Sequence, residues 1–514
     1  MRQVRLFPPL LLIFASLFFL YLSSSAIVSP DQLLWPLLVL CFVTGCLSFP
    51  AYWLTRDKDW ASILLLVVAL GFFSSGIFAF SYSVTVVLIT LLLAIAFRVL
   101  KRKLTANHFF LITNLVSGTA IALSGARLYQ GFKTIPSSYY ENYANGISSN
   151  ALIHLNSAAK VKPDIYYIIV DGYGRADMLE RLYEFDNSEF VRYLQGKGFI
   201  IASKSHSNYP KTALSVTSTL NMNYIDAFAP QLQDAPYWWL MAPWLDHNLV
   251  RNSLEKIGYK TVAISSDWSI TDNQTTDIYF KSHPIILSDF DRYLFGITPI
   301  KIFQPLFAQF SSVGTYDAHR ISQLNNFKAL IKSTSVSGPK FVFAHILLPH
   351  PPFVFSSDGT PINPKYSFSL NDGSEYHGTH LEYRNGYIGQ VQFLNEHLKV
   401  IINSILENSS RPSIIILQAD HGPGMLTDFN SPANSCLMER FSNFSAYYLP
   451  TVDKSIIPED ITPVNLFRII FNEYFATDLP LLENLQYDPR DKSTVYDFEN
   501  VTSLINRTDN CSLR

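Results

Sequence analysis

The sequence is poor in charged residues, and this shortage limits the partners that the protein can have. Charged residues make up 16% of the 514 residues, against roughly a quarter in an average soluble protein. Lys and Arg number 39 and Asp and Glu number 41, and no basic stripe runs through the C-terminal part. Because nucleic-acid binding depends on a basic surface, this balance argues against nucleic acid as a partner.

Cysteine is also scarce, with four residues in the whole chain. Cys41 and Cys46 lie in an apolar run, where we interpret them as inert packing residues. Cys436 and Cys511 lie in the globular part and could form a disulfide in an oxidising compartment. The sequence leaves this pairing open, because Cys511 lies almost at the C-terminus.

The hydrophobic residues, 48% of the chain, are concentrated before residue 130. Five apolar segments there approach the ~20 residues that a membrane-spanning helix needs: 7–26, 34–54, 61–80, 83–99 and 108–125. None has a centrally placed acidic residue or a pair of histidines, so the spans indicate an anchor and not an ion pathway. A cleavable signal peptide is the alternative for the first segment, but the four segments that follow favour a retained helix.

The basic residues of this region are confined to alternate loops. They precede the first segment, separate the second from the third, and separate the fourth from the fifth: Arg2, Arg5, Arg56, Lys58, Arg98, Lys101, Arg102 and Lys103. The positive-inside rule then places the N-terminus in the cytoplasm and everything after residue 130 outside it. We therefore predict a transmembrane domain of five helices at 1–130, a juxtamembrane linker at 131–160 and an extracytoplasmic domain at 161–514.

The globular part alternates between apolar β-branched runs and helix-like stretches such as 383–404. The runs at 164–170, 261–265, 341–347 and 413–417 are typical of buried strands in a parallel sheet. Strands that alternate with helices predict an α/β sandwich with a mostly parallel sheet. In such folds ligands bind beyond the carboxyl ends of the strands.

Three of these strand ends carry side chains that can bind a metal. Asp171 follows the first strand, His345 lies near the end of the third with His350 in the loop after it, and Asp420 and His421 follow the fourth. Singly, the acids before glycine could be turn residues and the histidines could be core or loop residues. Their shared placement favours one site, and carboxylate and imidazole ligands without thiolates suit Zn²⁺ or Mn²⁺.

Here the sequence resembles the sulfatase-like enzymes of the alkaline phosphatase superfamily. Residues 163–172 resemble the first strand and first metal-binding acid of that family, and Leu-Gln-Ala-Asp-His-Gly at 417–422 resembles its late S-D-H-G motif. Leu-Pro-His-Pro-Pro at 348–352 resembles its H-x-P loop. The resemblance covers residues 160–480 and implies an alkaline-phosphatase-like α/β sandwich whose metal is held by Asp171, Asp420 and His421.

Residues 208–216 resemble the T-A-x-S-x nucleophile segment of phosphoethanolamine transferases, which implies that Thr212 is both the nucleophile and a metal ligand. A helix start suits that role, because free N–H groups and a positive dipole end gather there. The alternative is that Thr212 only caps the helix. Ser215, Thr217 and Ser218 are the alternative nucleophiles.

The family's sulfate chemistry requires a C/S-x-P-x-R segment, and none follows Asp171 at the proper place, which argues against sulfate ester hydrolysis. A five-span anchor with an external domain resembles lipoteichoic acid synthases and lipid A phosphoethanolamine transferases. This resemblance implies a bacterial-type inner-membrane enzyme with a periplasmic catalytic domain. It would move a head group, such as phosphoethanolamine or phosphoglycerol, from a membrane lipid through a phosphothreonine to an envelope glycan or lipid. Those transferases usually have Glu where this chain has Asp171.

The remaining roles and readings stay open in the sequence. His350 would assist the leaving group or bind phosphate, and His345 would do the same or hold a second metal. Lys211 and Arg175 either bind phosphate or are surface charges, and we favour the surface. Arg440 could touch the site, but we leave it out of the site. The alternative functions are a membrane phosphodiesterase, phosphatase or sulfatase-like hydrolase with the same site, and a non-catalytic envelope protein.

Overall fold

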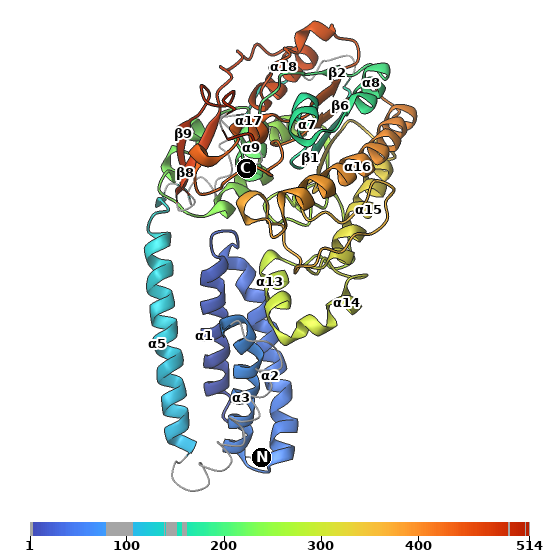
Figure 1. The fold of residues 1–514 in the computed structure, drawn as a ribbon. Coiled ribbons are helices and arrows are strands. Elements are labelled where there is room, and N and C mark those ends of the chain that lie inside the picture. Colours follow the sequence, from blue (N-terminus) through green and yellow to red (C-terminus); the bar gives the residue numbers. More distant parts are fainter. Residues whose placement is uncertain are drawn as a thin grey trace. The chain divides into compact units, whose positions relative to one another are not determined.

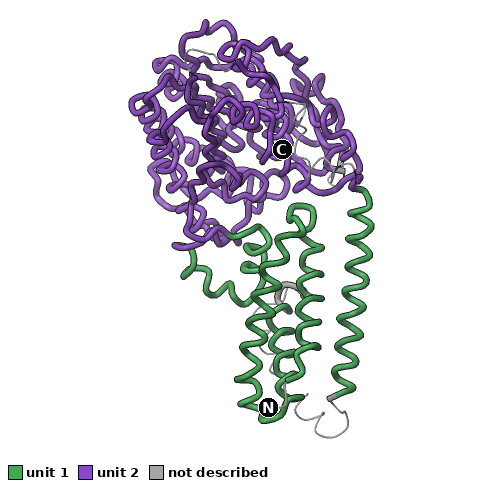
Figure 2. Tube along the Cα trace, turned by 180° about the vertical axis from the view of Figure 1, so that it is seen from behind, with its two compact units in different colours: residues 1–134, 287–308 green, residues 135–286, 309–514 purple. Residues whose placement is uncertain are grey.

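The computed structural model describes residues 4–78, 106–137, 139, 152–156, 162–491, 494–508 and 510–512. The chain forms two compact units (Figures 1 and 2). Unit 1 comprises Met1–Thr134 and Leu287–Ala308, and unit 2 comprises Ile135–Ile286 and Gln309–Arg514. The predicted boundaries at residues 130 and 160 stay predictions, and much of the predicted linker lies outside the described residues.

Unit 1 contains long apolar helices where the sequence predicts membrane spans. They are α1 (Phe7–Ser24), α2 (Leu34–Thr55), α3 (Lys58–Phe78) and α5 (Ala106–Phe132), and the 3₁₀ turn η1 (Pro30–Leu33) leads into α2. Among the described residues, three stretches are long and apolar enough to cross a membrane: Phe7–Ser24, Pro30–Thr55 and Asn107–Phe132. The predicted segment 83–99 lies outside the described residues, so the count of five spans stays a prediction.

The segment Leu287–Ala308 belongs to unit 1 although it lies within the sequence of the globular half. It contains α13 (Asp289–Ile297), η5 (Pro299–Phe303) and α14 (Gln304–Phe307). Ser288 caps α13 by accepting a hydrogen bond from the Asp291 backbone, and the Asp291 side chain accepts from the Ser288 backbone in return. This reciprocal cap satisfies amide groups that a helix start leaves without partners.

Unit 2 is built on a seven-stranded sheet in the order β2-β7-β6-β1-β5-β3-β4. The strands from β6 to β4 run parallel, and β7 runs antiparallel to both of its neighbours. Their bounds are β1 (Asp164–Val170), β2 (Ile200–Ile201), β3 (Lys260–Ile264), β4 (Ile278–Phe280), β5 (Lys340–Ile346), β6 (Ser413–Gln418) and β7 (Ser445–Tyr448). The mostly parallel α/β architecture expected from the sequence is confirmed, and the four predicted strands coincide with β1, β3, β5 and β6.

The central strand β1 is buried along its whole length, because helices cover both faces of the sheet. One face packs on α7 (Ala176–Tyr183), α8 (Ser188–Gly196), α15 (Tyr316–Ser333) and α16 (His380–Asn408). The other face packs on α9 (Thr212–Asn221), α12 (Leu249–Lys256) and α18 (Pro463–Phe475). Alternate residues of β1, such as Tyr166 and Tyr167, enter different cores, as the period of a strand dictates.

Smaller elements complete unit 2. They are α10 (Ile225–Phe228), η3 (Pro230–Leu232), η4 (Trp238–Met241), α11 (Ala242–Asp246), η6 (Gly373–Glu375), η7 (Pro432–Asn434), α17 (Leu437–Phe441), η8 (Lys454–Ile456) and the hairpin β8 (Tyr487–Asp491) with β9 (Thr494–Asn500). Cys436 and Cys511 form a disulfide, which answers the question that the sequence left open. The bond attaches the C-terminal segment to the start of α17.

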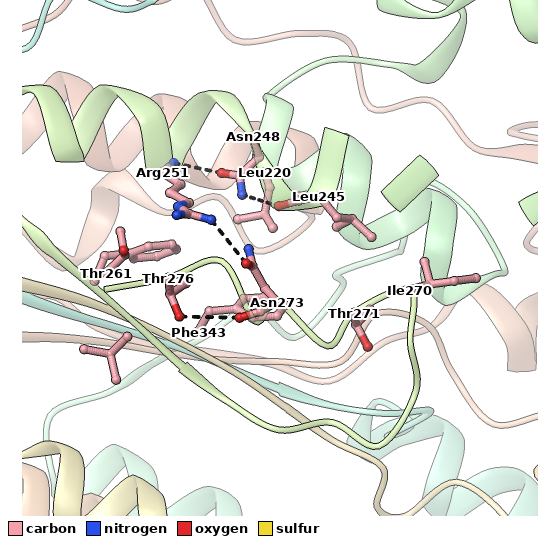
Figure 3. A pocket seen from close by; sticks show the side chains of 12 residues that line it. Leu220, Leu245, Asn248, Arg251, Thr261, Ile270, Thr271, Asn273, Thr276 and Phe343 are labelled. Atoms are coloured by element: carbon pink, nitrogen blue, oxygen red, sulfur yellow. Dashed lines mark hydrogen bonds between the residues drawn. The ribbon is translucent and has the colours of Figure 1, made fainter. Parts of the chain in front are cut away.

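A buried polar network lies on the α12 side of the sheet, where Arg251 lines a pocket (Figure 3). The Arg251 guanidinium donates to Glu255 at 2.7 Å, to the Thr275 carbonyl at 2.8 Å and to the Asn273 side chain at 3.2 Å. Asn248 caps α12 by accepting from the Arg251 backbone at 2.8 Å. The polar groups of this network are therefore bonded to one another.

Candidate metal centre

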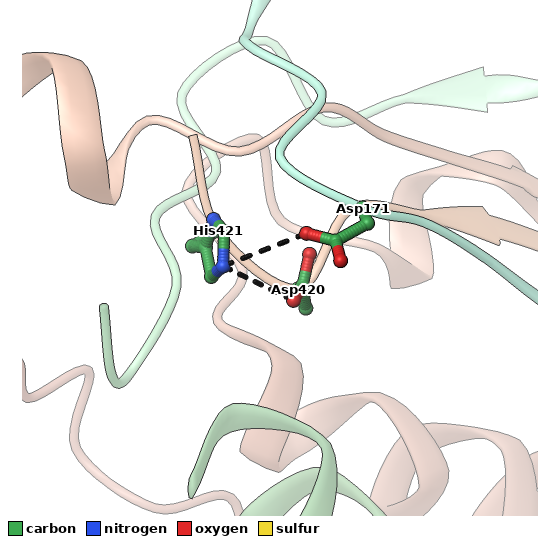
Figure 4. Close-up of side chains that lie close together, drawn as sticks. All are labelled: Asp171, Asp420 and His421. Carbon is green, nitrogen blue, oxygen red and sulfur yellow. Dashed lines mark ion pairs between the residues drawn. The ribbon is translucent and has the colours of Figure 1, made fainter. Parts of the chain in front are cut away.

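Asp171, Asp420 and His421 come together where two neighbouring strands end (Figure 4). The Nε2 atom of His421 lies 3.3 Å from Asp420 Oδ2 and 3.7 Å from Asp171 Oδ1. One possible ligand atom from each residue lies within 4.8 Å of the others, and all three side chains are buried. Two acids and an imidazole at this spacing match the donor set of a divalent cation.

The pairing of the strands places the two acids side by side. In the parallel β1–β6 ladder Ile169 pairs with Gln418, so Asp171 and Asp420 each lie two residues beyond that pair. Gly172 then turns the chain with a φ of 68°, and its N–H donates to Asp420 Oδ1 at 3.1 Å. A glycine suits this backbone conformation, because a Cβ atom would strain it. The Asp-Gly sequence thus sets the orientation of both acids.

The polar atoms of the cluster fit a cation. Asp171 Oδ1 and Asp420 Oδ2 are buried and have no hydrogen-bond partner among the described residues. A buried carboxylate oxygen without a partner is costly, and a bound cation would remove that cost. His421 Nδ1 lies 2.9 Å from the Gly422 carbonyl, and its Nε2 atom lies between the two acids and a guanidinium nitrogen of Arg440. The residues present therefore suit a divalent metal.

The electrostatic environment favours the protonation states that metal binding needs. Burial and the nearby Arg440 guanidinium lower the pKa of His421 to about 4, so this imidazole is neutral at pH 7. Burial alone would raise the pKa of Asp171, but the charge of His350 and the hydrogen bond from His345 lower it overall. An ionised carboxylate and a neutral imidazole are the forms that ligate metals.

Thr212 lies beside this cluster, at the first residue of α9. Its Oγ1 atom is 3.3 Å from His421 Nε2, and the side chain is buried. The helix itself is bonded to the segment that carries the candidate metal ligands, because the Ser215 hydroxyl donates to the Asp420 carbonyl at 2.7 Å. The other hydroxyls considered as nucleophiles donate to carbonyls of their own helix: Thr217 to Ala213 and Ser218 to Ser215.

The two predicted histidines lie on different sides of Asp171. His345 is fully buried on β5, with Nε2 3.4 Å from Asp171 Oδ2 and Nδ1 2.8 Å from the Thr271 hydroxyl. His350 lies in the loop after β5, where its backbone N–H donates to the Asp171 carbonyl at 3.1 Å. Its Nε2 atom is 3.9 Å from Asp372 Oδ2. The structure thus brings all the site residues singled out in the sequence to one edge of the sheet.

Comparison with known proteins identifies the family. The family model described as Sulfatase matches residues 163–467, which is more than half of the chain. The chain belongs to the sulfatase family. It is accordingly an enzyme of the sulfatase-like type. A search of the curated proteins found no match.

Solved structures similar to this sulfatase-family chain include transferases and sulfatases. The zinc complex of the C-terminal periplasmic domain of EcEptC from Escherichia coli has 10% identity and a TM-score of 0.45, covering 70% of this chain and 99% of that one. The lipooligosaccharide phosphoethanolamine transferase A (EptA) from Neisseria meningitidis has 11% identity and a TM-score of 0.39, covering 92% and 96%. A putative sulfatase from Bacteroides thetaiotaomicron has 11% identity and a TM-score of 0.40, covering 65% and 75%.

Two further charged residues of the sulfatase-family domain, Arg440 and Asp372, lie next to the candidate metal ligands. Arg440 donates to Asp372 at 2.7 Å and to the Pro210 carbonyl at 2.8 Å, and a guanidinium nitrogen lies 3.0 Å from His421 Nε2. Burial would raise the pKa of Asp372, but Arg440 and His350 lower it to about 2. Arg440, which we left out of the site, therefore contacts a residue of the candidate metal centre. Asp372 lies in an irregular loop, and no sequence motif marked it.

The two basic residues near the predicted motifs are not surface charges in the way we favoured. Arg175 is buried and donates to Asp177 at 2.6 Å and to the Ser205 carbonyl at 2.8 Å. Lys211, next to Thr212, is half-buried with its ammonium 2.9 Å from the centre of the Phe429 ring. Burial and the Arg440 charge lower the pKa of Lys211 to about 7. Arg175 is thus committed to local bonds, whereas Lys211 lies against the site.

Proposed function

We propose that this sulfatase-family enzyme transfers a phosphoryl-linked head group from a membrane lipid to a cell-envelope acceptor, a glycan or a lipid. The proposal rests on one observation: Thr212 Oγ1 lies 3.3 Å from His421 at the start of a helix that is bonded to the metal cluster. A hydroxyl beside a cation site, at the positive end of a helix, is arranged to attack a phosphorus atom.

A divalent cation, Zn²⁺ or Mn²⁺, held by Asp171, Thr212, Asp420 and His421, would lower the pKa of the hydroxyl and neutralise charge on the phosphate. The rest of the chemistry belongs to the chain. Thr212 loses its hydroxyl proton to solvent, and its oxygen forms a bond to phosphorus. The bond between phosphorus and the lipid's alcohol oxygen breaks, and His350 gives that oxygen a proton. The head group is then held as a phosphothreonine.

The second step reverses the first with a new partner. An acceptor hydroxyl attacks phosphorus, loses its proton to His350 and displaces the Thr212 oxygen, which takes a proton back from solvent, so that the enzyme returns to its starting state. Water in place of that hydroxyl would make the enzyme a phosphodiesterase or phosphatase, which is the second candidate function. Positioning and charge neutralisation supply most of the catalysis in such phosphoryl transfers.

Several contacts support the assignment of Thr212 over its neighbours. Ser215, Thr217 and Ser218 each donate their hydroxyl to a backbone carbonyl, and Ser215 thereby binds the carbonyl of a metal-site residue. A hydroxyl that anchors the backbone in this way has a structural task already. Thr212 instead directs its hydroxyl toward His421.

The surrounding charges fit the recognition of phosphate. Arg440 contacts His421, and both Arg440 and Lys211 lie over the Phe429 ring; we assign the two cations to the non-bridging phosphate oxygens. We assign His345 to positioning, because it is fully buried between the Thr271 hydroxyl and the carboxylate of Asp171. In this scheme His345 orients the first metal-binding acid and does not hold a second metal.

The apolar helices of unit 1 support a lipid as the donor, because they would hold the enzyme in the membrane that contains its substrate. The distribution of Lys and Arg supports a catalytic domain outside the cytoplasm, and we assign it to the periplasm of a bacterial-type cell envelope. A periplasmic site faces envelope glycans and lipids, which offer the hydroxyl groups that the second step needs.

The proposal is tested by trapping the head group on the enzyme. Purified full-length protein would be incubated with phosphatidylethanolamine or phosphatidylglycerol and Zn²⁺ or Mn²⁺, and its peptides analysed by mass spectrometry. We expect an adduct on Thr212 whose mass identifies the transferred group. In Thr212→Ala we expect no adduct and a loss of turnover of about a thousandfold or more.

A matched control is Thr360→Ala, which removes the same atoms from an exposed threonine outside the site. This variant should form the adduct at the normal rate. Full activity of Thr212→Ala, or an adduct on Ser215 in the unaltered protein, would show that the nucleophile is assigned to the wrong residue.

A further inference from the structure

A short segment of unit 1 exposes apolar side chains where polar ones are expected. In η5 and α14, Gln304 and Ala308 are buried, whereas Ile302 and Leu306 are 65% and 68% exposed. Phe303 and Phe307 are exposed as well. Residues at this spacing lie on one face of a helical segment, so the apolar face points outward and a polar residue points inward.

The same segment is attached to the membrane-anchor helices. Within unit 1 the Phe290 ring packs edge-on against Tyr21 of α1 at 6.1 Å between ring centres. The Phe290 N–H donates to the Gln32 side chain at 3.2 Å, and the Tyr293 hydroxyl lies 3.1 Å from that of Ser23. These contacts place α13 at the turn between α1 and α2, where both candidate spans end.

The location and the inverted polarity together decide what covers the exposed face. In water, four clustered large apolar side chains would be unfavourable, and a surface of this kind marks a contact with another apolar phase. At the end of membrane-spanning helices that phase is the acyl region of the bilayer just below the headgroups. Lys301, half-buried in η5, is suited to the headgroup layer, where a Lys side chain keeps its charge in water.

We infer that Ile302, Phe303, Leu306 and Phe307 form a membrane-interface foot that inserts into the leaflet at the turn between α1 and α2. In the sequence this foot lies between β4 and α15, so the chain enters the membrane layer twice, through the anchor helices and again through Leu287–Ala308. Two attachments far apart in sequence restrict the rotation of a tethered domain more than one does. The inference rests on the anchor helices spanning a bilayer and not on the transfer chemistry.

The depth of the foot is measurable in the full-length protein. Cys41 and Cys46 are replaced by alanine and the Cys436–Cys511 disulfide is kept, so that one introduced cysteine carries a nitroxide spin label. Leu306→Cys reports on the foot, and Leu381→Cys is the matched control, a leucine of unit 2 that is 64% exposed. Both proteins are reconstituted into vesicles of phosphatidylethanolamine and phosphatidylglycerol.

Collision with oxygen and with a water-soluble nickel complex then gives the depth of each label. We expect the oxygen-to-nickel accessibility ratio at residue 306 to exceed that at residue 381 by about tenfold, because the acyl boundary excludes the polar complex. Equal ratios would overturn the inference. Spin–spin broadening at residue 306 that vanishes on dilution with unlabelled protein would also overturn it, by showing that a second copy covers the face. Neither readout depends on turnover, so this inference is tested independently of the proposed reaction.

Discussion

Two polar clusters in unit 2 differ in how their hydrogen bonds are satisfied. Around Arg251, each polar group described above has a partner from the surrounding chain. Around Asp171 and Asp420, each acid keeps one buried oxygen without a hydrogen-bond partner among the described residues. A satisfied network stabilises a fold, whereas unsatisfied buried acids cost stability and persist where function requires them. The difference marks the cluster of Asp171 and Asp420 as the candidate functional site.

The largest effect expected from this comparison follows the change Asp420→Asn. The amide keeps an oxygen for the Gly172 N–H but removes the negative charge that a cation needs. We expect activity to fall about a thousandfold, which corresponds to about 4 kcal/mol in the activation barrier. The free energy of unfolding should stay within about 1 kcal/mol of that of the unaltered protein. Turnover with lipid substrate and thermal unfolding in detergent measure the two quantities, and a variant that is fully active would contradict the metal assignment.

Removal of the disulfide should instead lower the stability and leave the activity unchanged. The bond closes a loop between residues 75 apart in sequence, so the chain-entropy model predicts a loss of about 4 kcal/mol in stability when both cysteines become alanine. Neither cysteine is a candidate metal ligand, and we expect the specific activity of the folded variant to be retained. Thermal unfolding with and without reducing agent tests this, and a reductant-insensitive melting temperature would count against it.

Arg251→Met tests the satisfied cluster directly. Methionine keeps much of the apolar stem but leaves the acceptors at Glu255, Asn273 and Thr275 without their donor. Because the Glu255 side chain is 36% exposed, breaking this network should cost less than breaking a fully buried ion pair, about 2 kcal/mol of stability. We expect kcat/KM at a temperature where the variant is folded to change little. A large loss of kcat/KM at full stability would show that the pocket in Figure 3 takes part in the reaction.

The smallest predicted effect concerns Glu439, the buried residue that precedes Arg440. Its carboxylate accepts hydrogen bonds from the Tyr183 hydroxyl and the Leu426 N–H. Burial raises its pKa from 4.5 to about 8. Since the folded protein holds this proton to a higher pH than the unfolded chain, the free energy of unfolding falls as the pH rises from 4.5 to about 8. Glu439→Gln should reduce that fall by about 1 kcal/mol or more.

Melting temperatures of the unaltered protein and Glu439→Gln at pH 5 and pH 8 give the measurement. The two proteins should differ in the pH dependence of their melting temperatures and agree in specific activity at pH 7. If the two pH profiles were parallel, Glu439 would titrate at the same pH in the folded and unfolded protein, and the raised pKa would be wrong.

Local sequence patterns predicted the parallel strands of the sheet and that the residues after those strands would lie near one another. An apolar β-branched run forms β1 because it is buried on both faces, and the acids that follow such runs must lie at one edge of a parallel sheet. For that reason Asp171, Asp420 and His421 could be placed together before any coordinates. Thr212 was found through a resembling segment, and its distance to His421 is a tertiary feature.

Other parts of the site could not be read from local patterns. Asp372 lies in an irregular loop and Arg440 on the short helix α17, and neither has a periodicity or motif that signals a role. Their place beside His421 depends on the packing of segments far apart in the chain. The hydrogen bond from Arg175 to the Ser205 carbonyl likewise depends on the tertiary fold and could not be predicted from the sequence.

The sequence by itself indicated the parallel strands β1, β3, β5 and β6, the apolar helices of unit 1 and the residue types that follow the strands, because these depend on residues close together in the chain. Tertiary structure alone decided which hydroxyl faces the cluster, that Cys436 pairs with Cys511, and that Leu287–Ala308 joins the anchor unit. Each of these depends on distances between segments that are far apart in sequence, and such distances are set by the packing of the whole fold.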